Sequence, residues 1–114
     1  MSIARETSSL FSSVARERGR DVFHHRAINI VRGDAWAMTA STLGSTEYLI
    51  DLVRNNANHI TARCTCFEFA GRELCRHIWA ALLLAEKKDL LTGPGGRPHK
   101  VTLSADFSSI VIPQ

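Results

Sequence analysis

The sequence has no hydrophobic run long enough to cross a bilayer, since the longest, Ile78–Ala85, is far too short. The start of the chain has no apolar segment typical of a secretory signal peptide. The sequence also lacks internal repeats, blocks of like charge and the phosphate-loop pattern G-x-x-x-x-G-K-[ST]. It shows no catalytic set such as paired carboxylates beside a base or a Ser-His-Asp triad. These absences predict a cytoplasmic protein, which would be nucleoid-associated if it is bacterial and binds DNA. They also predict no membrane partner, no small-molecule substrate and no enzymatic function.

Cysteine is scarce, and all three cysteines lie in one stretch: Cys64-Thr-Cys66, eight further residues, then Cys75-Arg-His77. An odd count argues against a closed disulfide framework, and clustered cysteines in an intracellular protein are typical of metal binding. A chain of 114 residues with 45% hydrophobic residues is one small domain with a thin core. A metal would stabilise such a domain.

The spacing of these four residues predicts how they converge. Side chains two apart on a strand point the same way, so Cys64 and Cys66 project together from a strand end. Residues two apart on a helix lie about 200° apart, so Cys75 belongs at the cap and His77 in the first turn. Three thiolates and one imidazole suit one tetrahedral, structural Zn²⁺. The alternatives are three reduced structural cysteines with a surface histidine, a catalytic Cys75–His77 pair, or an iron–sulfur cluster.

Hydrophobic periodicity predicts an α+β fold. A short N-terminal helix at about residues 7–18 should end at Gly19, and a main helix should run from Cys75 to about Leu91. Between them, four strands joined by short turns predict an antiparallel β-meander, with Trp36 directed towards the core. We expect a zinc-stapled domain at residues 1–91 (core 20–91), then a linker and tail at 92–114. Residues 101–103 and 110–112 have strand composition, so the segment 101–114 either adds an edge strand or begins a unit that the chain does not complete. The four predicted strands cover residues 27–31, 35–43, 47–53 and 59–66.

The formal net charge of +3 is mildly basic and permits nucleic-acid contact without requiring it. Arginines near the cysteines either neutralise the charge of the zinc centre or form a phosphate-contacting patch with arginines nearer the N-terminus. Trp79 is either a packed aromatic residue or a base-stacking platform. The candidate DNA-binding residues are Arg18, Arg20, Arg26, Arg63, Arg72 and Arg76.

The pattern C-x-C-x8-C-x-H resembles the signature of the SWIM zinc-finger family, with Cys64, Cys66, Cys75 and His77 at the ligand positions. The stretches 17–23, 27–31 and 43–48 resemble the region before the finger in bacterial members, where the module commonly precedes a Swi/Snf-type helicase-like ATPase. Phe67 stands where many members have proline, and Arg76 where many have lysine.

The resemblance implies a ββα-like zinc module that binds DNA non-specifically or docks a partner in DNA transactions. Family members also occur in Mutator-type transposases and among small partners of RecA-like recombinases. The alternative is therefore an adaptor for a helicase-like or RecA-like ATPase with no direct nucleic-acid contact.

Overall fold

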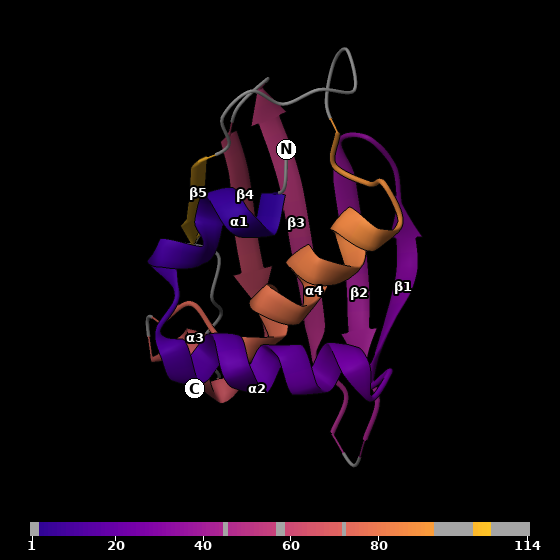
Figure 1. Ribbon diagram of the computed structural model, residues 1–114. Helices are drawn as coiled ribbons and strands as arrows, with labels where there is room; N and C mark the ends of the chain where they lie inside the picture. The colour runs from indigo at the N-terminus through magenta and orange to yellow at the C-terminus, as the bar shows by residue number, and fades with distance from the viewer. Residues whose placement is uncertain (1–2, 45, 57–58, 72, 93–101, 106–114) are drawn as a thin grey trace, which may run out of the picture.

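The fold has two layers, with the helices packed on one face of a five-stranded sheet (Figure 1). The computed structural model describes residues 3–44, 46–56, 59–71, 73–92 and 102–105. The described helices are not long and apolar enough for any of them to span a membrane. In chain order the elements are α1 (Ile3–Thr7), the 3-10 turn η1 (Ser8–Leu10), α2 (Ser13–His24), β1 (Ile28–Gly33), β2 (Ala37–Thr42), β3 (Leu49–Asn56), β4 (His59–Cys64), α3 (Phe67–Ala70), α4 (Arg76–Lys87) and β5 (Thr102–Ala105).

The sheet confirms the predicted α+β class and the antiparallel meander. The strand order is β1-β2-β3-β4-β5, and each of the first four strands pairs antiparallel with the next. β5 comes from the segment expected to be a linker and tail, and it pairs with β4 in parallel as an edge strand. Alternation along the strands directs apolar side chains towards the helices. The buried apolar side chains of the described strands are Ile28, Met38, Ala40, Ile50, Leu52, Ile60, Ala62, Cys64 and Leu103.

The N-terminal helix differs from the prediction of residues 7–18. Thr7 ends α1, and α2 begins only at Ser13 because the Ser12 hydroxyl accepts a hydrogen bond from the Ala15 N–H (3.0 Å). α2 then passes through Gly19 to His24. Gly19 does not end the helix. It allows α2 to approach α4, since a Cβ there would lie 2.6 Å from the Arg76 carbonyl oxygen.

The two tryptophans have opposite environments. Trp36 was predicted to lie in the core, but β2 begins one residue later and Trp36 is 46% exposed in the preceding turn. There its backbone N–H donates to the Asp34 carboxylate (2.7 Å). Trp79 on α4 is buried, and its ring centroid lies 5.1 Å from that of Phe11. Trp79 is therefore a packed aromatic residue, and its ring is not available to stack on a base.

Candidate metal centre

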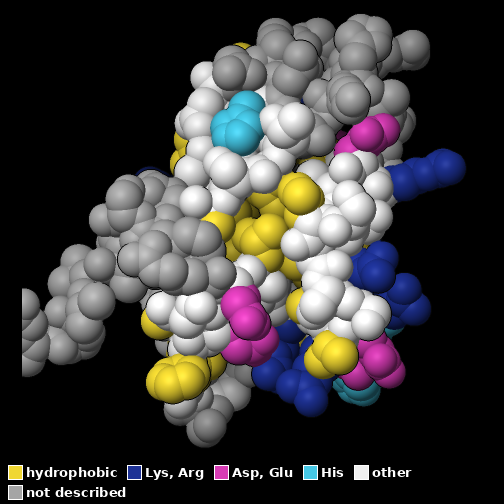
Figure 2. Space-filling model, turned by 90° about the vertical axis from the view of Figure 1, so that its left-hand side faces the viewer, with side chains coloured by type: hydrophobic (Ala, Val, Ile, Leu, Met, Phe, Trp, Pro, Cys, Tyr) yellow, Lys and Arg dark blue, Asp and Glu magenta, His cyan; other side chains and the backbone are white. Residues whose placement is uncertain are grey.

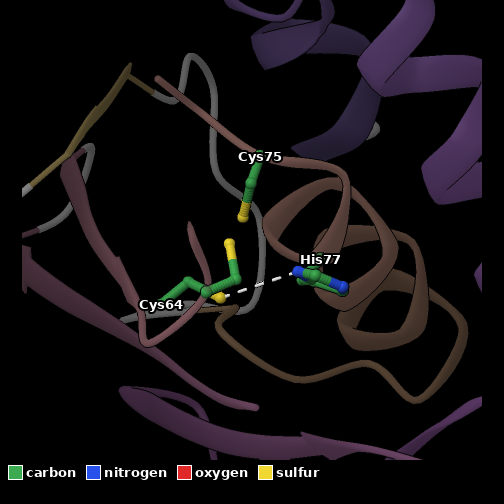
Figure 3. Close-up of side chains that lie close together, drawn as sticks. Cys64, Cys75 and His77 are labelled. Carbon is green, nitrogen blue, oxygen red and sulfur yellow. Dashed lines mark hydrogen bonds between the residues drawn. The ribbon is translucent and has the colours of Figure 1, made fainter. Parts of the chain in front are cut away.

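The four predicted zinc ligands come together where the sheet meets α4. Cys64 is the last residue of β4, and Cys66 directly precedes α3. Cys75 has extended backbone (φ −90°, ψ 168°) and is the N-cap of α4, which places His77 in the first turn as expected from the spacing. Figure 3 shows the side chains of Cys64, Cys75 and His77 pointing towards one another from the strand end and the helix start.

The geometry of this cluster fits one tetrahedral ion. One candidate ligand atom from each of the four residues lies within 4.8 Å of the others. Sulfurs bound to zinc at about 2.3 Å in a tetrahedron lie about 3.8 Å apart, so only a small contraction is needed. The Cys64 sulfur already lies 3.9 Å from His77 Nδ1. The cysteines are buried and His77 is half-buried, so the cluster fits one structural Zn²⁺ held by four protein side chains.

The pKa values of the three thiols are shifted in different directions. Hydrogen bonds with Cys66 and Cys75, together with burial, raise the pKa of the Cys64 thiol above its ordinary range. The pKa of Cys66 is lowered because its sulfur accepts hydrogen bonds from Cys64 and Cys75. At Cys75 the hydrogen bond with Cys64 lowers the pKa, but the hydrogen bond with Cys66 and burial outweigh it and raise the pKa to about 12. Burial and mutual hydrogen bonding therefore hold back the protons of Cys64 and Cys75, which zinc binding must displace.

The loop between the two ligand pairs is held by contacts that the sequence did not reveal. Phe69 is fully buried on α3, and its backbone N–H lies 3.4 Å from the Cys66 sulfur. Nε and Nη2 of Arg76 each lie 2.8 Å from the Glu68 carboxylate, which joins α3 to α4. Both pairs depend on the helical turn of α3, and a turn this short gives no periodic signal in the sequence.

A second unpredicted contact lies behind His77. The Tyr48 ring centroid is 5.1 Å from that of His77, with 35° between the ring planes. Strand alternation assigns Tyr48 to the same face as Ile50, and this was the one sequence signal for its position. His77 and Tyr48 also line a crevice of about 250 Å³, together with residues from α2 and the β2–β3 connection.

The candidate DNA-binding arginines do not form one patch. Arg63 lies on the rear face, meaning the face of the sheet turned away from the described helices, and its Nη2 is 3.7 Å from the Asp51 carboxylate. Arg76 is paired with Glu68, and Arg72 is outside the described residues. The remaining three are exposed and lie on α2 or in the turn that follows it: Arg18, Arg20 and Arg26.

Comparison with known proteins supports the assignment of the metal centre. Residues 52–86 match the family model described as SWIM zinc finger. The matched segment begins in β3, includes β4 and α3, ends in α4 and contains all four metal-binding candidates. Searches of curated proteins and of solved structures found no match.

Proposed function

We propose that this chain, whose residues 52–86 match the SWIM zinc-finger family model, binds DNA without sequence preference. The observation that carries the proposal is the group of three exposed arginines on and after α2. No carboxylate in the described part of the chain lies within 4.0 Å of Arg18, Arg20 or Arg26. Guanidinium groups without a carboxylate partner are free to contact phosphates, which are the main source of non-specific affinity for DNA.

The charges around these arginines favour weak and non-specific contact. Arg18 and Arg20 are two positions apart and leave α2 about 200° apart around its axis. Exposed Glu17 and Asp21 lie on the same helix. Figure 2 shows basic side chains gathered at the lower right of the molecule, at the level of α2, with acidic side chains beside them. This mixture suits a few phosphate contacts and offers no array of side chains for reading bases.

The size of the expected effect follows from the number of free arginines. Three phosphate contacts give a slope of about −2.7 for log K against log salt concentration. The affinity for duplex DNA should therefore fall about 40-fold between 50 and 200 mM salt. Fluorescence anisotropy with a labelled duplex and zinc-loaded protein measures this directly.

Matched variants make this experiment specific. Replacing Arg18, Arg20 and Arg26 together by glutamine should remove the binding and the salt dependence. Arg63→Gln is the control, because Arg63 is an exposed arginine beside a carboxylate on the rear face. Absence of binding at 50 mM salt, or equal loss in the control, would refute DNA binding through α2.

The second candidate function is a protein-binding adaptor for a helicase-like or RecA-like ATPase, and one residue favours it. Phe67, at the start of α3 directly after Cys66, is 90% exposed. A large aromatic side chain held out from a zinc-fixed loop is the type of group that anchors a protein interface. Affinity capture from the native host, with the bound proteins identified by mass spectrometry, tests it. The adaptor hypothesis expects an ATPase that wild-type protein recovers and Phe67→Ser does not. Capture of no ATPase by the wild type contradicts it.

A further inference from the structure

His77 reaches the cysteine cluster through one particular ring nitrogen. Nδ1 lies 3.9 Å from the Cys64 sulfur, and Figure 3 shows the other ring nitrogen directed away from the sulfurs. Rotation of the ring by half a turn about the Cβ–Cγ bond would put a carbon where Nδ1 now lies. This bond has a broad, roughly two-fold torsional preference and does not fix the ring by itself. Neighbours that restrict rotation of the ring therefore favour binding of zinc by His77.

Tyr48 is placed to do this. Its ring lies against the His77 ring, with 5.1 Å between the centroids. The backbone of Tyr48 is fixed by two hydrogen bonds to buried Thr42: the Tyr48 N–H donates to the Thr42 hydroxyl (2.9 Å), and the Thr42 N–H donates to the Tyr48 carbonyl (3.0 Å). The ring of Tyr48 thus projects from a rigid point beside the first turn of α4.

The surroundings of this ring pair increase the importance of Tyr48. The same two side chains line the crevice of about 250 Å³, whose other walls include Val22, Ala27 and Leu43. Loss of the Tyr48 ring would enlarge the crevice on the side where the two rings are now in contact. The imidazole would then have room to rotate.

We propose that Tyr48 is a positioning residue for zinc: it holds the His77 imidazole with Nδ1 directed at the three sulfurs. The partner residues of histidine ligands fix ring orientation in other metal sites, commonly by a hydrogen bond. Here a tilted contact between the two rings restricts rotation of the imidazole. The inference concerns the metal centre and does not depend on whether the module binds DNA or protein.

The test compares Tyr48→Ala with Tyr48→Phe, which keeps the ring and removes only the hydroxyl. Zinc affinity is measured by competition with a chromophoric chelator. Loss of an aromatic contact should weaken zinc binding about 3- to 10-fold in Tyr48→Ala. Tyr48→Phe should stay within about twofold of wild type. If Tyr48→Ala does not fold, Tyr48→Leu, which retains apolar volume without the ring, replaces it.

A control separates ring orientation from general loss of stability. Phe23 is a half-buried aromatic residue of α2 that packs against the core, and its ring contacts His24 and the Lys87 ammonium, away from His77. Phe23→Ala should leave the nitrogen–metal bond unchanged. Nitrogen NMR of labelled histidine in the zinc-loaded protein should show Nδ1 bound in wild type, Tyr48→Phe and Phe23→Ala, and a second ring state in Tyr48→Ala. A zinc affinity in Tyr48→Ala equal to that of Tyr48→Phe, or an unchanged His77 spectrum, would overturn the proposal.

Discussion

Substitution of Gly19 by alanine tests the close contact between α2 and α4. Gly19 is buried in the middle of α2, where replacing glycine by alanine normally stabilises a helix by about 1 kcal/mol. Here an added Cβ would lie 2.6 Å from the Arg76 carbonyl oxygen and 2.8 and 2.9 Å from two atoms of Trp79. One of these neighbours is backbone in the first turn of α4. The other is a buried ring that packs against Phe11, so neither moves easily.

The magnitude follows from two opposing effects. Overpacking a filled interior costs about 1–3 kcal/mol, and three contacts under 3.0 Å place this site at the upper end. After subtracting the helix-propensity gain, the free energy of unfolding should fall by about 2 kcal/mol. For a domain of this size, that loss corresponds to a decrease in Tm of roughly 10 °C.

The assay is urea and thermal unfolding of zinc-loaded protein, followed by circular dichroism. Gly71→Ala is the matched control, because Gly71 is exposed, has φ −78° and has no contact closer than 3.3 Å for a new Cβ. Its stability should change by less than about 0.5 kcal/mol. Unchanged or increased stability of Gly19→Ala would refute the reasoning, because α2 would then have room to move away from α4.

Three other predictions concern the metal centre and the start of α2. Chelation by EDTA should abolish the cooperative thermal transition, because about 10–16 kcal/mol of zinc-binding energy is lost. Elemental analysis of purified Cys75→Ser should find well under one zinc per chain, and a normal zinc content would contradict the assignment. Zinc binding near pH 7 should release about two protons, because the pKa values of Cys64 and Cys75 are raised and that of Cys66 is lowered. The zinc affinity should therefore fall as the pH falls. Calorimetry in buffers of different ionisation enthalpy counts the protons released. Ser12→Ala should cost about 1 kcal/mol in urea unfolding through loss of the N-cap of α2, whereas no change would mean that the cap is dispensable.

The sheet and the metal cluster were predictable because local rules determine them. Period-two alternation assigns Ile60, Ala62 and Cys64 to one face, and short turns make consecutive strands antiparallel neighbours. The geometry of a helix start determines that Cys75 precedes the first turn and His77 lies within it. Each of these steps uses residues close together in the sequence, and the structure bears them out.

The errors came from residues whose roles depend on distant parts of the chain. Glycine after a helical pattern is typical of a helix end, but Gly19 is required where Trp79 approaches α2. Alternation directed Trp36 inwards, but the carboxylate of Asp34 holds the turn before β2 and leaves the ring exposed. The strand partner of β5 could not be predicted from the sequence either, because its parallel pairing with β4 joins segments separated by two helices.

The zinc centre matters to the proposed DNA-binding arginines although none of them is a zinc ligand. Arg18 and Arg20 lie on α2, which has no metal-binding residue and packs against α4 at Gly19. The first turn of α4 carries His77, and its N-cap is Cys75, so zinc fixes α4 to the end of β4. Zinc therefore positions α2 indirectly, by fixing the helix α4 against which α2 packs. Loosening either contact should shift α2, together with its arginines, relative to the rest of the domain while leaving their charge unchanged, so a loss of DNA binding in Gly19→Ala would report geometry and not electrostatics.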